Sequence, residues 1–171
     1  MSTNPYTAPR AAVSDIEVEQ EYQEIRIWSA SGRIGRLRYL AYSTGATLLA
    51  GVVAGLAAAV DPTLGSLVSL VAYCGALVFT VIAGIKRSHD MDWSGWTFLL
   101  ALIPIVGLIW VFKSGTQGAN SHGAPPPPNT MGVKILGFLL PAVMVVGILA
   151  AIAIPAYVDY QKRAAGYEQP Q

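Results

Sequence analysis

Long apolar runs alternate with short polar segments along this chain. Four runs contain no charged residue, and they cover residues 39–60, 64–85, 97–112 and 135–157. A helix rises about 1.5 Å per residue, so roughly 20 apolar residues cross the hydrocarbon core of a bilayer. Lipid offers no partner for backbone groups, and apolar runs of this length therefore form helices there. The pattern predicts an all-α polytopic membrane protein with about four hydrophobic helices.

The third run, residues 97–112, is short for a full crossing. Pro104 and Gly107 stand at its centre, and Pro104 lacks a backbone donor that lipid cannot replace. The run either crosses as a kinked helix or enters the bilayer and returns to the same side. We favour four crossings, because they place Lys162 and Arg163 in the cytoplasm, where basic residues are enriched.

Polar residues between the runs predict their connections. Asp61-Pro62-Thr63 favours a tight turn, in which Asp61 or Thr63 caps the following helix. Four consecutive prolines at 125–128 favour an extended linker. We expect the fourth run to bend near Pro141.

Composition shifts divide the chain into five segments. Acidic and apolar residues mix over residues 15–28, which predicts an amphipathic helix on the membrane surface with Trp28 near the headgroups. The segments are a polar tail that contains this helix (1–28), a membrane helical domain (29–124), a Pro-rich linker (125–134), a transmembrane helix (135–160) and a soluble tail (161–171).

Composition and charge narrow the class of protein. Apolar residues make up 53% of the chain and charged residues 12%, whereas about a quarter of residues are charged in soluble domains. The net charge is only +1, and the basic residues are scattered, so we expect no nucleic-acid partner. The single cysteine, Cys74, excludes an intrachain disulfide.

Arg33, Arg36 and Arg38 crowd the entrance to the first run. Such a basic flank is typical of the cytoplasmic side and predicts that the N-terminus stays there. The start of the chain does not read as a cleavable signal, so we expect the first span to direct targeting. The arginines either serve topology alone, bind anionic lipid headgroups, or form ion pairs with Asp90 and Asp92.

Residues 86–96 form a polar knot between the second and third runs. His89 and Asp90 could exchange a proton there, because ionisable groups at membrane depth suggest a relay or a ligand site. A metal site would require His89, His122 and Asp90 to converge, and Ser88 beside His89 does not form a triad. We predict no enzymatic activity, no metal and no cofactor.

We favour an interfacial interpretation of the same knot. In it, Arg87 pairs with Asp90, and Asp92 caps the third helix. Trp93 and Trp96 anchor the segment at the headgroups.

A second polar loop follows the third run. Gly118, Asn120 and Gly123 predict a turn whose backbone amides hold an anion or a partner, or a plain tight turn in which Asn120 bonds its own backbone. We favour the plain turn.

Three segments in order resemble the bacterial inner-membrane family named domain of unknown function 805, over about residues 27–128. They are Ser31 to Tyr39, Lys86 to Trp96, and Ile103 to Gly107 followed by Gly115 to Gly123. The family pattern has leucine where Ser88 stands and an aromatic residue where His122 stands. The resemblance implies a small bacterial inner-membrane protein and no particular reaction.

A C-terminal segment, about residues 137–163, is similar to the N-terminal helix of type IV pilins. The resemblance is carried by Gly137-Phe138 and by Gly147 to Tyr160, while the glutamate that pilins bury near their leader cleavage site is missing. It implies an anchor helix that runs from the cytoplasm outward.

Together these features predict a non-enzymatic, multi-pass protein of the bacterial cytoplasmic membrane with a structural or partner-recruiting role. The expected partners are the lipid bilayer, including anionic lipids, and an unidentified membrane protein or a second copy of the chain. Two alternatives remain open: a small transport or channel-like component, and an accessory of pilus or secretion machinery.

Overall fold

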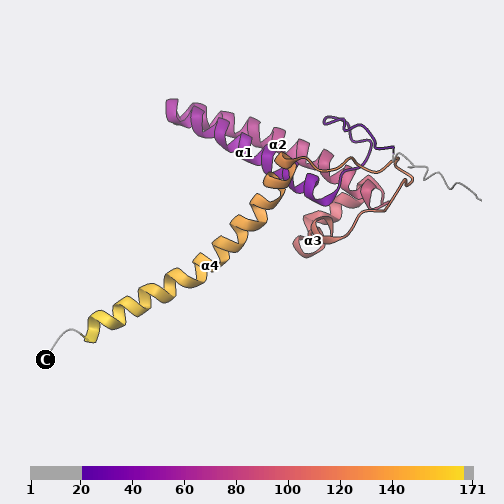
Figure 1. Cartoon of the computed structure of the whole chain (residues 1–171). Helices are drawn as coiled ribbons and strands as arrows, with labels where there is room; N and C mark the ends of the chain where they lie inside the picture. Colours follow the sequence, from indigo (N-terminus) through magenta and orange to yellow (C-terminus); the bar gives the residue numbers. More distant parts are fainter. Residues whose placement is uncertain (1–20, 168–171) are drawn as a thin grey trace, which may run out of the picture.

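The computed structural model describes residues 21–167, and helices dominate this part (Figure 1). An isolated bridge between Asn120 and Gly123 is the sole β feature of these residues. In chain order the helices are α1 (Arg36–Val60), α2 (Pro62–Asp90), the 3₁₀ helix η1 (Gly95–Leu102), α3 (Pro104–Phe112) and α4 (Met131–Tyr167).

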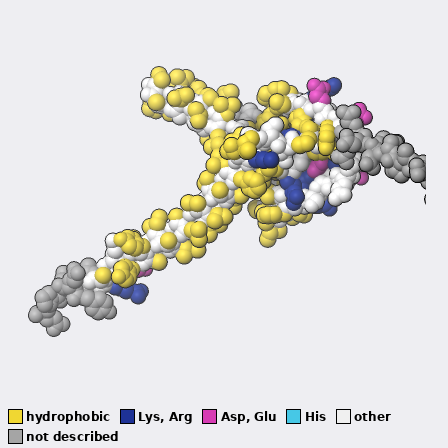
Figure 2. Space-filling model, in the orientation of Figure 1, with side chains coloured by type: hydrophobic (Ala, Val, Ile, Leu, Met, Phe, Trp, Pro, Cys, Tyr) yellow, Lys and Arg dark blue, Asp and Glu magenta, His cyan; other side chains and the backbone are white. Residues whose placement is uncertain are grey.

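Three helices of the described chain are long and apolar enough to cross a membrane. They are α1, α2 and residues Met131–Ala164 of α4. Hydrophobic side chains cover most of their length (Figure 2). Apart from a few charged side chains near the far end of α4, the basic and acidic side chains gather where α1 begins and α2 ends (Figure 2). We call this region the loop end. The predicted all-helical class is confirmed for the described residues, which provide three candidate spans; the predicted fourth span is not confirmed.

The α1–α2 hairpin follows the predicted turn. Asp61 accepts a hydrogen bond from the Leu64 N–H at 2.8 Å, and Pro62 occupies the first position of α2, where its missing N–H is harmless. The two helices meet closely at Gly65, where a Cβ atom would lie 2.5 Å from the Cα of Ala58. At its other end α2 continues to Asp90, so half of the polar knot is helical.

The third apolar run forms a hairpin instead of one kinked helix. The η1 segment ends at Leu102 and α3 begins at Pro104, and the lack of a side chain at Gly107 lets the Ala101 carbonyl come close. Both ends of the run lie at the loop end, because Gly95 packs against Ile85 and α3 packs on α2. The tip is apolar and uncovered.

The fourth run forms a longer helix than predicted. It begins at Met131 instead of residue 135 and passes through Pro141 and Pro155 without interruption. It continues to Tyr167, so the tail predicted to be soluble is helical over residues 161–167. It packs on α1 only near its start, where a Cβ on Gly137 would meet Leu37, and then diverges from the hairpin (Figure 1).

The amphipathic helix predicted over residues 15–28 is wrong where it can be assessed, since residues 21–28 form no helix. The Gln23 N–H bonds to the Pro125 carbonyl, which draws this segment against the Pro-rich linker. Trp28 packs edge-on against Phe79 with ring centroids 5.5 Å apart. Tertiary contacts thus replace local helical hydrogen bonds; residues 15–20 lie outside the described part.

Candidate functional site

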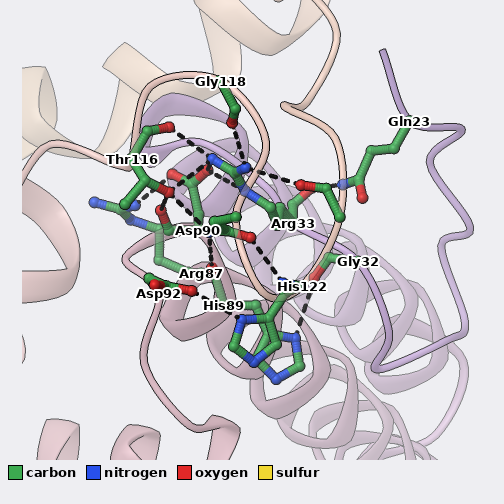
Figure 3. A network of polar contacts seen from close by, with 12 residues as sticks. Gln23, Gly32, Arg33, Arg87, His89, Asp90, Asp92, Thr116, Gly118 and His122 are labelled. Atoms are coloured by element: carbon green, nitrogen blue, oxygen red, sulfur yellow. Dashed lines mark hydrogen bonds and ion pairs between the residues drawn. The ribbon is translucent and has the colours of Figure 1, made fainter. Parts of the chain in front are cut away.

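Two arginines and one aspartate form a buried cluster at the loop end (Figure 3). Arg33, Arg87 and Asp90 are 1%, 0% and 3% exposed. One carboxylate oxygen of Asp90 lies 2.7 Å from Arg87 Nη1, and the other lies 3.2 Å from Arg33 Nη2. We call these three residues the Arg-Asp-Arg cluster. A single carboxylate bridges two guanidinium groups, and the cluster carries one positive charge in excess.

Besides Asp90, backbone carbonyls are the main acceptors for the two guanidinium groups. Arg33 donates to the carbonyl oxygens of Thr116, Gly118 and Gly123. Arg87 donates to those of Trp110 and Lys113. Because a buried arginine needs a partner for every N–H group, the residues that follow α3 wrap around the two side chains. The carbonyl dipoles point toward the excess positive charge.

Local sequence explains how the charged side chains meet. Arg87 and Asp90 are three residues apart at the end of α2, so they share one face of the helix. Arg33 lies just before α1 and follows Gly32, whose φ of 85° favours glycine. Gly115 passes so close to the Asp90 carboxylate that a Cβ atom there would overlap it.

The predicted turn at Gly118, Asn120 and Gly123 is confirmed in its plain form. Asn120 Oδ1 accepts a hydrogen bond from the His122 N–H at 2.9 Å, and both glycines have positive φ angles. The carbonyls of the two glycines bind Arg33, rather than their amides binding an anion. The turn therefore belongs to the cluster.

Of the three arginines before the first span, Arg33 alone forms a predicted ion pair. Arg36 is exposed and donates to the Phe112 carbonyl at 2.9 Å. Arg38 is buried and donates to the carbonyls of Pro127 and Pro128. The alternative in which Arg36 and Arg38 pair with Asp90 and Asp92 is not realised among the described residues, where main-chain carbonyls accept their hydrogen bonds.

Asp92 does not cap the third helix. Its carboxylate accepts hydrogen bonds from the hydroxyl and the N–H of Ser121, at 2.5 and 3.2 Å. The N-cap position of η1 is held by Ser94. The hydroxyl bond from Ser121 lowers the pKa of Asp92, because it stabilises the ionised form.

The cluster lies in the part of the chain that matches a known protein family. Residues 27–124, more than half of the chain, match the family described as protein of unknown function (DUF805). The chain belongs to the DUF805 family. The match spans the whole Arg-Asp-Arg cluster and its turn, and it ends before the linker and α4. No curated protein and no solved structure matches the chain. The pilin resemblance of α4 therefore stays a prediction.

Several residues of this DUF805 site were missed by sequence reasoning. Trp110 is fully buried and donates its indole N–H to the Ser88 hydroxyl at 2.9 Å. Ser88 stands at the position where the family resemblance implies leucine. The place of Trp110 within an apolar run concealed it, although a buried indole N–H requires an acceptor. Lys86 is also buried, and its ammonium group donates to the Arg26 carbonyl.

The two tryptophans of the polar knot, Trp93 and Trp96, lie in different environments. Trp96 is 81% exposed at the start of η1, at the loop end, where an interfacial anchor would lie. Trp93 instead packs edge-on against Trp110, and the Lys113 ammonium lies 4.5 Å from its ring centroid.

The structure stacks His89 on His122, with ring centroids 4.1 Å apart. His89 Nδ1 lies 3.2 Å from the Gly32 carbonyl oxygen, and no hydrogen bond links His89 to Asp90 within residues 21–167. Over the same residues, no group of three or more His, Cys, Asp or Glu side chains is placed to hold a metal ion. The two histidines thus meet, as a metal site would require, but the Asp90 carboxylate is bonded to the arginines instead.

Proposed function

We propose that this DUF805 protein is a non-enzymatic protein of the bacterial cytoplasmic membrane that holds a rigid platform at the cytoplasmic surface and recruits a partner there. The platform comprises the end of α2, η1, α3 and the loop of residues 113–123. Its partner is a lipid or another membrane protein. The observation that supports this proposal best is that both arginines of the Arg-Asp-Arg cluster are bonded within the protein.

Both arginines of the cluster are buried, and their donors are bonded to Asp90 or to main-chain carbonyls. A catalytic acid or base, or an arginine that binds an anion, must contact its substrate, whereas these arginines contact other groups of the protein. Buried ion pairs of this kind are costly to break and favour one arrangement of the surrounding chain. That supports a platform whose shape is set before a partner arrives.

The proposal includes a topology with three crossings. The run of residues 97–112 turns back, and α4 starts beside the N-terminal end of α1. With the N-terminus in the cytoplasm, α4 then carries the C-terminal end to the opposite side. Most basic residues stay in the cytoplasm in this arrangement, and only Lys162 and Arg163 lie outside, which fits the positive-inside bias.

Cysteine accessibility in cells tests the topology. In a Cys74→Ser background, the exposed residues Ser121 and Lys162 are changed to cysteine one at a time and treated with a membrane-impermeant maleimide. We expect labelling of the Lys162→Cys variant in intact cells, and labelling of the Ser121→Cys variant only in inverted vesicles. Four crossings would give the opposite result at both sites, and that result refutes this part of the proposal.

Photocrosslinking tests recruitment. A photoreactive amino acid at Ser121 reports on the platform, and one at the exposed Thr63 reports on the far end of the hairpin as a matched control. We expect discrete adducts from residue 121 that disappear when Asp90→Asn loosens the platform. Adducts that are identical from both positions, or that persist unchanged in the Asp90→Asn variant, would contradict a preformed recruiting surface.

A further inference from the structure

A cleft of about 730 Å³ opens between the first turns of α1 and α4 and the end of α3. This volume falls in the range typical of ligand sites, about 300–1,000 Å³. The polar lining residues Arg36, Thr116 and Asn129 come from the first turn of α1 and from the loops after α3 and before α4, so they mark the polar end of the cleft. The apolar lining residues Leu40, Phe138 and Pro141 lie further along α1 and α4 and mark its apolar end. A headgroup joined to acyl chains has this same division of chemistry.

The polar end is suited to an anion. Arg36 is exposed and uses Nη1 on the Phe112 carbonyl, which leaves other guanidinium donors available. The half-buried amide of Asn129 bonds to no residue of the described chain. The N-terminus of α1 also borders the cleft through Gly35 and Leu37, with no side-chain cap and no acidic residue in its first turn. The helix dipole therefore adds to the positive potential.

Asp90 borders the same cleft, but its negative charge does not repel an anion there. Both of its oxygens are bonded to arginines, so its charge is more than balanced. Arg33 and Arg38 are buried with their terminal nitrogens bonded inside the protein. Of Arg33, Arg36 and Arg38, Arg36 is thus the one placed to reach a ligand in this cleft.

The apolar end opens toward the bilayer. Helices α1 and α4 touch near Leu37 and Gly137 and then diverge (Figure 1). The side chain of Phe138 is largely exposed on this open side. Because both candidate spans begin at the cleft, its polar end lies at the depth of the lipid headgroups.

We propose that this cleft binds one anionic phospholipid, with its phosphate at Arg36 and Asn129 and its acyl chains between α1 and α4. Basic pockets between membrane helices recognise anionic headgroups through the same electrostatics. The proposal rests on the function proposed above in one respect: it names the lipid partner of the platform. It depends on the local meeting of α1, α3 and α4, and not on which side of the membrane they face.

Native mass spectrometry of the full-length protein in a neutral detergent tests this site. The protein is titrated with phosphatidylglycerol and, separately, with phosphatidylcholine of the same chain length. One basic residue near an anionic headgroup contributes a preference of about five-fold. We expect that preference in the wild type and its loss in Arg36→Gln.

Arg26→Gln is the matched control. Arg26 is exposed at 76% of its side-chain area and pairs with Glu24 at 3.9 Å, and it does not line the cleft, so its variant also loses one surface cation but leaves the cleft intact. Equal preference in the Arg36→Gln and Arg26→Gln variants, or no preference in the wild type, would overturn the assignment. Inorganic phosphate should not displace the lipid, and displacement by it would indicate a free-anion site instead.

A variant that fills the cleft tests the apolar end. Leu40→Trp should weaken the binding of both lipids to a similar extent, because the ring occupies the path of the acyl chains. Unchanged binding of both lipids would contradict the placement of the chains. Cysteine labelling of the same variants separates the outcomes, since an altered topology changes labelling and loss of the lipid site does not.

Discussion

Asp90→Asn tests the central feature of the fold most directly. The substitution keeps the size of the side chain and removes its charge, so Arg33 and Arg87 lose the one carboxylate that lies between them. The amide nitrogen of asparagine would also face a guanidinium donor. Removing one partner of a buried ion pair typically destabilises a protein by about 3–5 kcal/mol.

For a chain of this length, such a loss lowers the melting temperature by the order of 10 °C. Thermal unfolding of the detergent-solubilised protein, followed by near-ultraviolet circular dichroism, measures it through the packing of the buried Trp110. Asp92→Asn is the matched control, because Asp92 is exposed and contacts only the Ser121 and His122 side of the loop. We expect a much smaller change in that control. Equal melting temperatures for the two variants would refute the reasoning.

A triple variant, Arg33→Met with Arg87→Met and Asp90→Leu, sharpens the same test. Apolar replacement of a whole buried ion triad is often neutral or stabilising. Here the arginines also satisfy five carbonyl groups of the loop and α3, which methionine would leave without donors. We therefore expect no recovery, and a triple variant as stable as the wild type would show that the carbonyl contacts contribute little.

Two further variants address the loop that encloses the cluster. Gly115→Ala should lower the melting temperature, because its methyl group would overlap the Asp90 carboxylate; Gly132→Ala, where nothing lies within 4 Å, should not, and equal effects would contradict the close approach. Ser121→Ala should raise the pKa of Asp92, measured by carboxyl NMR titration, because it removes the hydroxyl bond that lowers it. Because folding lowers the pKa of Asp92, its carboxylate stabilises the loop at any pH above the ordinary aspartate pKa, and this stabilisation is lost as the pH falls through the lowered pKa. In the Ser121→Ala variant the pKa is lowered less, so the loop should loosen at a less acid pH. An unchanged titration would remove Ser121 as the cause.

Part of the site was predictable because its residues are close in the chain. Arg87 and Asp90 are three residues apart, and a helix brings such residues together wherever it lies. Asn120 forms its turn with His122 for the same local reason. The partner of Arg33 was harder to predict. Its ion pair spans 57 residues and was one of several alternatives that the sequence left open.

Side-chain partners differ from the predictions where distant segments compete for the same groups. An ion pair of Arg38 with an aspartate was one of three alternatives, but the linker carbonyls of Pro127 and Pro128 accept its hydrogen bonds. Asp92 was expected at the start of a helix, but Ser121 holds it from another loop. Neither outcome is encoded by spacing, because each depends on how the loops cross at the ends of the spans.

The sequence by itself determined that the chain forms long apolar helices, several of them long enough to cross a bilayer, separated by short polar segments. Hydrophobic length is a local property, and bilayer thickness converts it into helices without knowledge of any neighbour. Only the tertiary structure decided that residues 97–112 turn back and that one carboxylate is shared by two arginines. Those features exist because buried charges and main-chain carbonyls must find partners, and the partners come from segments that the chain brings together only on folding.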